Sequence, residues 1–322
     1  MPKLVNLRQQ ITTNFNLAIT TLLAVNIEVS GSPASLLGEV RLFKEGIMPE
    51  DGVKGNCYLS QTEIDQFNSE GYLIFDGFFD KDLNQRLKED VDQLMINRTN
   101  KGETTLIAFP ALGPLTSEPT VVDRVADLMG TTFTHHHIHA RWQGKGESGV
   151  SWHHDYEQVP QTNRSHLMVH VFIYLDGLNG EIGDLLVLPG SHQRVMARDA
   201  YRQFMHEDLP GSVTIDNLSS GSFVIVHSAL QHARRPKPGG ETFRRYFIDT
   251  SYCQHGILWP AGRRLWHLNQ MALDLGWDRD GKYTFLYDNS CFFDPHDYME
   301  QFNIQNQGSL AVRLMVETDS TS

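Results

Sequence analysis

The sequence predicts a mainly β protein, a sandwich or jelly roll, with helices bracing one sheet. From about residue 131 onward, short apolar stretches are separated by turns, and no long helical pattern lies between them. That texture is typical of antiparallel β folds. Before residue 131, apolar residues recur at helical spacing instead. The expected strands are 132–142, 150–155, 167–175, 185–188, 222–226 and 245–251.

The expected helices have recognisable starts. Ser60 is a good N-cap residue, and Glu63 three positions later completes a capping box before a helix that ends near Gly71. A second helix begins near Asp80 and carries one apolar stripe. These helices are expected to pack outside the sheet. The remaining elements expected in this part are a strand over 72–75 and a helix over about 120–129.

The chain length suits one large domain with extensions, because 322 residues can bury a sizeable core. Residues 1–55 are expected to be an N-terminal extension, broken by a Gly/Pro turn at 30–33, with an amphipathic helix over 17–25. Residues 56–322 are expected to form the single folded domain. Its aromatic-rich part, about 255–300, is expected to be a C-terminal capping segment.

Charge and cysteine content narrow the functional class. Thirty-nine acidic against 27 basic residues give a net charge of −12, which argues against nucleic-acid binding. No apolar run approaches the roughly 18 residues that a membrane span needs. Cys57, Cys253 and Cys291 form an odd set without a CxxC pair, so a reducing compartment is the simplest context. We therefore expect a cytoplasmic protein without a membrane or nucleic-acid partner.

The segment Trp152-His153-His154-Asp155 carries the strongest chemical signal. On an extended strand alternate side chains share a face, so His153 and Asp155 point one way and His154 points the other. With His232 as a second imidazole, these groups would form the 2-His-1-carboxylate set of non-haem Fe(II) oxygenases, which leaves the opposite metal positions open. The alternative is a hydrogen-bonded pair at a strand edge, because His-x-Asp is common by chance.

Further segments follow this one in a fixed order. They are Gly183 to His192 (GDLLVLPGSH), Gly221 to His232 (GSFVIVHSALQH), and Phe243-Arg244-Arg245 after a Pro/Gly stretch. Together with the first segment, they resemble the phytanoyl-CoA dioxygenase family of Fe(II)/2-oxoglutarate-dependent oxygenases. The resemblance runs from about residue 60 to residue 251 and does not cover residues 1–55 or the C-terminal segment.

The resemblance implies a double-stranded β-helix, the cupin-like form of the jelly roll, and an enzyme that binds Fe(II) and uses 2-oxoglutarate and O2 as cosubstrates. It implies hydroxylation of an unactivated C–H bond of a small-molecule substrate, with release of succinate and CO2. Halogenating relatives carry a small residue where Asp155 stands, so this carboxylate favours hydroxylation or another outcome of hydrogen abstraction. The alternatives are desaturation, cyclisation or epimerisation in natural-product biosynthesis, and a non-oxidative metal-binding cupin.

The resemblance assigns the metal to His153, Asp155 and His232. His227 competes with His232 for the third position. The family pattern of H-x-x-x-x-H before a Pro/Gly loop favours the second histidine, so His232 is the expected ligand. No catalytic side chain is expected beyond this metal site.

The distal carboxylate of 2-oxoglutarate calls for a planar, bidentate donor, which only arginine provides. Arg244 is favoured because it follows Phe243, as the family's arginine often follows an apolar residue. Arg245, which faces the opposite side of the strand, is the alternative. The resemblance also makes His139 and Gln143 expected contacts of 2-oxoglutarate. The alternative is that these polar residues only form hydrogen bonds along the strand.

The substrate pocket is expected to include Arg141, Trp152 and Tyr156. In the run from His135 to His139, alternate histidines are expected to share one strand face. They are spaced in a line along the strand and do not converge on one ion. We therefore expect no metal site within this run, and the resemblance implies that this strand lines the pocket.

Overall fold

The computed structural model describes residues 58–100, 102, 105–158, 164–236, 244–261 and 265–295. The expected extension over 1–55, its helix over 17–25 and Cys57 lie outside these residues. Those expectations therefore stay predictions, as does the division of the chain at residue 55.

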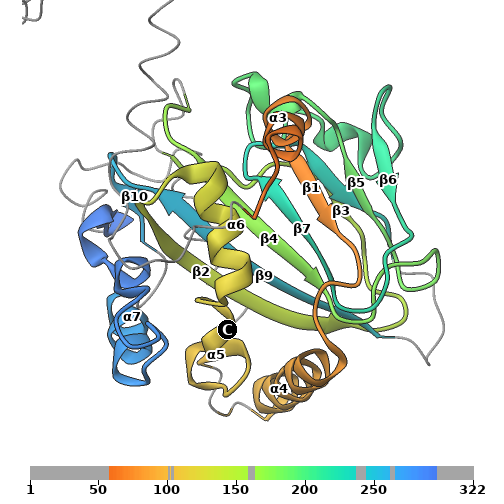
Figure 1. The fold of residues 1–322 in the computed structure, drawn as a ribbon. Helices are drawn as coiled ribbons and strands as arrows, with labels where there is room; N and C mark the ends of the chain where they lie inside the picture. The colour runs from red at the N-terminus through yellow and green to blue at the C-terminus, as the bar shows by residue number, and fades with distance from the viewer. Residues whose placement is uncertain are drawn as a thin grey trace, which may run out of the picture. The chain divides into compact units, whose positions relative to one another are not determined.

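The larger sheet is antiparallel throughout. In spatial order, its strands within the described ranges are β1 (Tyr72–Phe75), β7 (Ser222–His227), β4 (Met168–Tyr174), β9 (Arg245–Gln254) and β2 (Phe133–Gln143). Figure 1 shows β1 and β2 at the two edges of this sheet. The central strands β4 and β7 are buried along almost their whole length, as expected when both faces of a sheet are covered.

The smaller sheet is also antiparallel. Its strands, in spatial order and within the described ranges, are β3 (Val150–His153), β8 (His232–Arg234), β5 (Leu185–Val187) and β6 (Val213–Ile215). A separate parallel pair joins β10 (Trp259–Pro260) to β11 (Phe292–Phe293). Strands that follow one another in the chain therefore often belong to different sheets.

An apolar cluster joins the two sheets. Phe172 and Tyr174 of β4 pack with Leu185 and Val187 of β5 and with Ile215 of β6. Successive side chains of a strand point to opposite faces, so the sequence neighbours of Phe172 contribute to a different core on the other face of the larger sheet. Each face of this sheet thus has its own packing partner.

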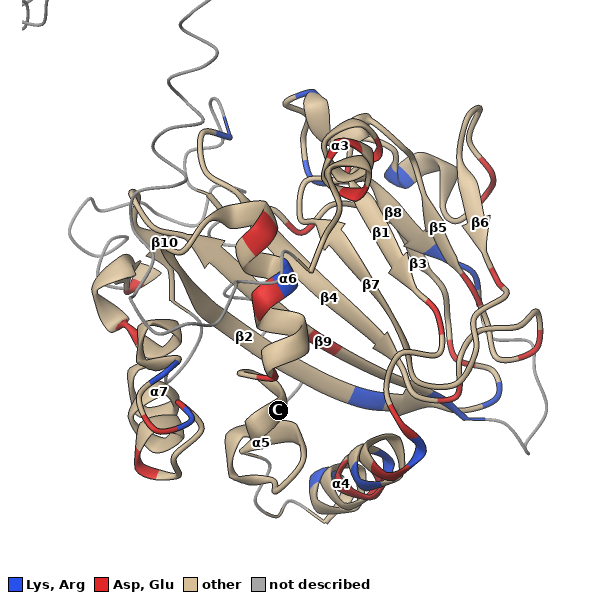
Figure 2. Ribbon diagram, in the orientation of Figure 1, with Lys and Arg blue, Asp and Glu red and all other residues tan. Residues whose placement is uncertain are grey.

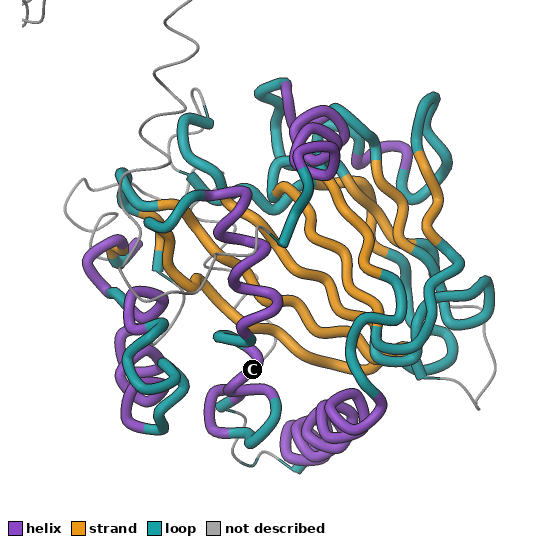
Figure 3. The backbone as a smooth tube through the Cα atoms, in the orientation of Figure 1, coloured by secondary structure: helices purple, strands orange, loops and turns teal. Residues whose placement is uncertain are grey.

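Helices cover that other face of the larger sheet (Figures 1 and 3). The helices in the described ranges are α3 (Gln61–Glu70), α4 (Lys81–Thr99), α5 (Leu112–Leu115), α6 (Pro119–Met129) and α7 (Leu265–Asp274), with the 3-10 turns η2 (Leu106–Ala108), η3 (Ser191–Gln193), η4 (Arg202–Phe204), η5 (Thr284–Tyr287) and η6 (Asn289–Cys291). Val91 of α4 and Val125 of α6 are fully buried in one cluster with Val171 of β4. No helix in these ranges is long and apolar enough to cross a bilayer.

The mainly antiparallel β character and the flanking helices are confirmed. Ser60 caps α3, and the reciprocal bond from Glu63 is present as the capping box predicts. Every predicted strand is present within a few residues of its expected bounds. The sequence did not indicate β6 or β8, because strands of three residues are too short to display a period of two.

Candidate metal centre and its pocket

The predicted metal ligands converge where β3 ends and β8 begins. His153 is the last residue of β3 and pairs in register with His232, the first residue of β8. Asp155 follows closely, held by a hydrogen bond from its backbone N–H to Ser228 O (2.7 Å). One carboxylate oxygen of Asp155 lies 3.4 Å from His153 Nε2, and the other lies 3.2 Å from His232 Nε2.

Backbone carbonyls determine which imidazole nitrogens carry hydrogen. His153 Nδ1 lies 2.8 Å from Ser151 O, and His232 Nδ1 lies 3.0 Å from Leu230 O. A carbonyl only accepts, so each Nδ1 is the donor and each neutral ring presents a bare Nε2. Two bare nitrogens and the Asp155 carboxylate then lie within 4.8 Å of one another. Acceptors that meet without a hydrogen between them fit a cation, and this donor set fits Fe(II).

The charges of these residues suit metal binding at neutral pH. Burial, reinforced by the neighbouring His232, lowers the pKa of His153 to about 4. Burial alone would raise the pKa of Asp155, yet the two imidazoles hold it well below its usual range. His153 is therefore a neutral ring and Asp155 a carboxylate, which are the forms in which these groups bind metal.

Arg198 supports the carboxylate from outside the ligand set. Its Nη2 donates to Asp155 Oδ1 (3.1 Å) and its Nε donates to His154 O (3.0 Å). The His154 ring lies elsewhere, with Nε2 3.2 Å from Met196 O, as strand alternation predicts. Arg198 lies 43 residues beyond Asp155, and no spacing in the sequence indicated it.

A pocket between the two sheets connects the predicted metal ligands to a buried arginine. Arg245 is 2 % exposed and its Nη2 donates to Asp184 O (2.6 Å). Its Nε and Nη1 have no hydrogen-bond partner among the described residues. A buried guanidinium with open N–H groups fits a carboxylate ligand, because unpaired buried donors are costly. The pocket is lined by Val150, His153, Asp155, Phe172, Tyr174, Leu185, His232, Ala233, Arg234, Arg245, Phe247 and Asp249.

Gly183 leaves room beside this arginine. A Cβ atom at Gly183 would come within 2.9 Å of Arg245 Nη1. Its φ of +126° is also a conformation that side chains other than glycine rarely adopt. The glycine that opens the second motif of the sequence therefore serves the arginine end of the pocket.

Arg244 lies outside the pocket, and the preference for it is corrected. Its side chain is 47 % exposed, its Nη1 donates to Asp92 Oδ1 (2.9 Å), and its guanidinium lies 4.3 Å from the centre of the Trp142 ring. Consecutive residues of a strand face opposite sides, and the pocket side belongs to Arg245. The residue type before the arginine was a poor guide, because strand register fixes the direction of the side chain.

The other predicted residues of β2 lie opposite β9 and differ in how close they come to the pocket. Gln143 is buried and its Oε1 accepts a hydrogen bond from Arg234 Nη1, so it lies at the arginine end. Arg141 forms an ion pair with Glu147 (3.1 Å), and neither it nor the exposed His139 lines the pocket among the described residues. The register pairs are Gln143 with Arg245, Arg141 with Phe247, and His139 with Asp249.

Trp152 and Tyr156 belong to the core and do not line the pocket, so their expected role is corrected. Trp152 packs with Leu186, and its indole N–H donates to Glu207 O (2.8 Å). Tyr156 lies in a separate apolar cluster and donates its hydroxyl to His166 O. Both residues are sequence neighbours of metal ligands, and alternation along the chain turns them to the other side.

His227 also lies apart from the ligands. Its ring contacts Phe67 and His192, and its Nδ1 accepts a hydrogen bond from Ala229 N (3.0 Å). The structure therefore groups His232, and not His227, with His153.

A β-bulge in β2 overturns one expectation about the histidine run. The register shifts between His135 and His137, so His135 pairs with Tyr252 while His137 pairs with Ser251. His135 is buried and its ring contacts Tyr252 in the core. It therefore does not share a face with His137 and His139.

Two charged residues of the pocket were not among the expected site residues. Arg234 and Asp249 both line it. Arg234 lies two positions after His232 and Asp249 four positions after Arg245, so the period of two along a strand would have indicated both.

A comparison with known families gives the family of the chain. The family model described as phytanoyl-CoA dioxygenase matches residues 58–245, which is more than half of the 322-residue chain. The chain belongs to the phytanoyl-CoA dioxygenase family. This family uses Fe(II), 2-oxoglutarate and O2, so these are the cofactor and cosubstrates of the chain. No curated protein sequence matches the chain.

Solved structures share the fold at low sequence identity. HygX from Streptomyces hygroscopicus, crystallised with nickel and 2-oxoglutarate, is 16% identical with a TM-score of 0.51, covering 62% of this chain and 88% of its own. AviO1 from Streptomyces viridochromogenes Tue57 is 18% identical with a TM-score of 0.50, covering 63% and 99%. SnoK, a non-haem α-ketoglutarate-dependent carbocyclase from nogalamycin biosynthesis, is 16% identical with a TM-score of 0.51, covering 66% and 90%.

Proposed function

We propose that this chain is an Fe(II)/2-oxoglutarate-dependent dioxygenase that hydroxylates an unactivated C–H bond of a small molecule and releases succinate and CO2. One observation carries the proposal. The acceptor atoms of His153, Asp155 and His232 share a pocket with the buried Arg245, whose Nε and Nη1 are open. A non-oxidative metal-binding cupin gives no reason for such a guanidinium beside its metal.

We further propose that the two sheets form a double-stranded β-helix within a domain spanning 56–322, with 1–55 as an extension. Strand order supports this fold. The larger sheet reads β2-β9-β4-β7 with β1 added at one edge, and the smaller reads β3-β8-β5-β6. From β2 to β5 the chain alternates between the sheets, and from β6 to β9 it alternates again, which is how two Greek keys build a jelly roll.

Each pocket residue has a distinct task in this proposal. His153, Asp155 and His232 would hold Fe(II) on one face, with the two Nδ1–H bonds and Arg198 fixing the orientation of the ligands. Bound iron and 2-oxoglutarate together supply the oxidising power that activates O2 for attack on a C–H bond.

Arg245 would bind the distal carboxylate of 2-oxoglutarate through its open N–H groups. Gln143 orients Arg234 beside it. Phe172 and Phe247 line the same pocket and exclude water from the space between the arginine and the metal ligands.

The direct test is succinate formation by protein purified without oxygen and then given Fe(II), 2-oxoglutarate and air. Slow turnover of 2-oxoglutarate without the substrate is expected, so the substrate need not be known. His232→Ala should abolish the succinate, whereas His227→Gln, which changes a histidine outside the pocket, should retain it.

The outcome that would refute the proposal is equally specific. It is the absence of succinate together with the absence of the charge-transfer absorption that Fe(II) and 2-oxoglutarate give when bound to one site. The metal-binding cupin would then become the better account.

A further inference from the structure

A group of possible metal ligands lies outside the pocket, just beyond the end of β9. His255 directly follows β9, Asp288 caps the turn η6, and Cys291 is the last residue of that turn. One ligand atom from each of these side chains lies within 4.8 Å of the other two. The match to the family model ends at residue 245, so neither the family nor the proposed function accounts for this group.

The end of the larger sheet positions both sides of the group. His255 N donates to Thr132 O (2.9 Å), which fixes the chain as it leaves β9. Thr134 of β2 donates its hydroxyl to Leu286 O (2.8 Å), just before Asp288. The strand β11 begins directly after Cys291 and pairs with β10. Ligands placed by strands and their hydrogen bonds are held more precisely than ligands on loops.

The imidazole of His255 has a nitrogen that calls for a partner. Its Nε2 is buried and has no hydrogen-bond partner among the described residues. A buried polar atom without a partner is costly, because it has given up water without gaining another bond. A metal ion bound to this nitrogen would remove that cost.

Asp288 and Cys291 have the chemistry that complements this nitrogen. Ser290 N and Ser290 Oγ donate to different oxygens of Asp288 (2.8 Å each), and the backbone bond most of all lowers the pKa of the carboxyl group. Each oxygen keeps a lone pair for a cation. Burial raises the pKa of the Cys291 thiol. Such a thiol is a poor nucleophile by itself, whereas binding of a metal would displace its proton.

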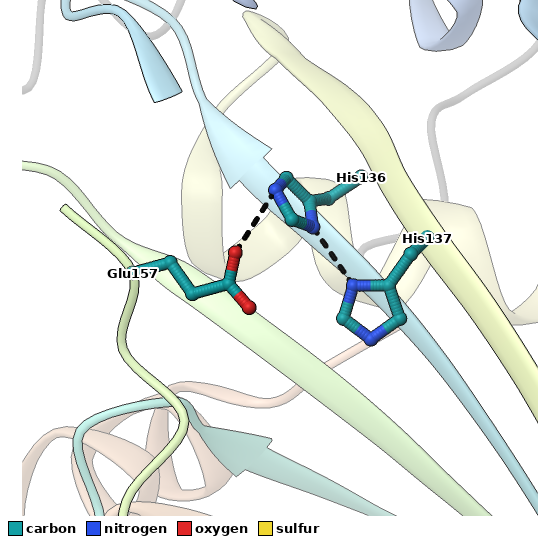
Figure 4. Close-up of side chains that lie close together, drawn as sticks. All are labelled: His136, His137 and Glu157. Carbon is teal, nitrogen blue, oxygen red and sulfur yellow. Dashed lines mark hydrogen bonds and ion pairs between the residues drawn. The ribbon is translucent and has the colours of Figure 1, made fainter. Parts of the chain in front are cut away.

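The group of His136, His137 and Glu157 differs from this one (Figure 4). His136 Nδ1 lies 2.8 Å from His137 Nδ1, and His136 Nε2 lies 3.2 Å from Glu157 Oε2. In a further group, Asp249 Oδ1 likewise lies 2.9 Å from His170 Nδ1. Those atoms have partners within their own group, which is sufficient to bring them together without an ion.

We propose that His255, Asp288 and Cys291 bind a Zn²⁺ ion, separate from the iron, which joins the segment 284–293 to the end of β9. Zinc takes nitrogen, oxygen and sulfur ligands in a tetrahedron, with a water molecule at a position that the protein leaves open. A thiolate favours zinc over magnesium or calcium, which take oxygen ligands. Ligand atoms around one zinc lie about 3.5 Å apart, so a small contraction of the group suffices.

The test uses Co(II), which replaces zinc and gives a near-ultraviolet charge-transfer band when a thiolate binds it. The full-length protein is freed of metal with a chelator, kept reduced under argon and titrated with Co(II). The thiolate band should form, and added Zn(II) should abolish it. The predicted iron ligands contain no sulfur, so Co(II) bound to them gives no such band. His232→Ala should therefore retain it.

Variants identify the thiolate and its neighbour. Cys291→Ala should abolish the band. Cys253→Ala, at a cysteine of the same apolar cluster, and Cys57→Ala, at the third cysteine of the sequence, should retain it. His255→Gln keeps the thiol and should raise the Kd for Co(II) at least about a hundredfold, more than loss of an outer-shell partner does. It also covers the case in which Cys291→Ala fails to fold.

A second readout follows the segment that the ion would hold. Zn(II) should slow hydrogen exchange of the backbone amides of η6 and β11 in the wild-type protein, because an ion that binds only the closed arrangement opposes local opening. The same addition should leave the exchange of these amides unchanged in Cys291→Ala.

Several results would overturn the inference. They are the absence of a thiolate band in the wild-type protein, a band that survives in Cys291→Ala, a band that is lost in Cys253→Ala or Cys57→Ala, or hydrogen exchange that Zn(II) does not slow. These measurements use no 2-oxoglutarate, O2 or turnover. Failure of the proposed function would therefore leave the test of the zinc site intact.

Discussion

Arg245 and Asp249 stand on one face of β9, and their partners Gln143 and His139 stand opposite them on β2. The Arg245 end is basic and deeply buried, with Gln143 bonded to a second arginine. The Asp249 end carries a carboxylate among imidazoles and is partly exposed through His137. Figure 2 shows basic positions near one end of the β2–β9 pair and an acidic position further along β9.

The difference between these ends suggests how one pair of strands can bind two different ligands, one at each end. A buried cation with open donors suits a dicarboxylate of fixed structure, which every family member must bind. The Asp249 end is more exposed, so it leaves room for the ligand that differs between family members. The predicted metal ligands line the same pocket as both ends, so two molecules bound at the two ends would meet beside them.

Removing a predicted metal ligand should have the largest effect, because it weakens the binding of Fe(II) between the two ends of the pocket. Asp155→Ala should lower Fe(II) affinity by well over a hundredfold, since loss of an outer-shell partner alone costs about 10- to 100-fold. Anaerobic metal titration measures this. Arg198→Lys should lower Fe(II) affinity by only about 10- to 100-fold, because Arg198 is an outer-shell partner. Equal losses of Fe(II) affinity in both variants would contradict the assignment of the ligands.

The ion pair at the acidic end should make stability depend on pH. The folded-state pKa of His170 is raised to about 9, so its contribution to stability is full below about pH 6.5 and is lost as pH rises through about 9, a change of about 3 kcal/mol. Asp249 has a lowered pKa, so its contribution to stability is lost when the carboxylate is protonated in acid. Denaturant unfolding from pH 6 to 10 should show this loss in wild type and not in His170→Gln/Asp249→Asn. If the free energy of unfolding depends on pH in the same way in both proteins, this prediction is contradicted.

Loosening the basic end should have the smallest effect of the three. Gln143→Leu removes the acceptor that holds Arg234 Nη1 and should raise the KM for 2-oxoglutarate about five- to tenfold. This is less than the effect of losing a direct hydrogen bond to a charged group, because the lost bond holds Arg234 and not 2-oxoglutarate. Steady-state succinate formation measures it. The control is Thr214→Val, at a residue of β6 that does not line the pocket. An equal rise of the KM in this control would contradict the role assigned to Gln143.

The sequence predicted the grouping of His153, Asp155 and His232 and the mainly β fold. Local periods indicated the fold and the first two residues, and the resemblance to the family indicated His232. Alternation along one strand placed His153 and Asp155 on the same side, and the structure brings His232 to them. The short apolar stretches and turns after residue 131 likewise indicated antiparallel sheets.

The remaining features depend on register, which a single sequence does not display. Whether Arg244 or Arg245 faces the pocket depends on how β9 pairs with β2 and β4. The bulge beside His136 turns His135 to the opposite face of the strand. Nothing in the histidine run itself indicates an extra residue. The contact between His137 and Asp249 joins two strands and has no local signature at all.

The most direct test of the account compares two neighbouring arginines. We would titrate 2-oxoglutarate into Fe(II)-loaded wild type, Arg245→Gln and Arg244→Gln under argon and follow the charge-transfer band. Arg245→Gln should weaken 2-oxoglutarate binding by about 30-fold or more, as expected for loss of one partner from a buried charge pair. Arg244→Gln should stay within about twofold, because it breaks only an exposed ion pair. Equal weakening in both variants, or weakening in Arg244→Gln alone, would contradict the account.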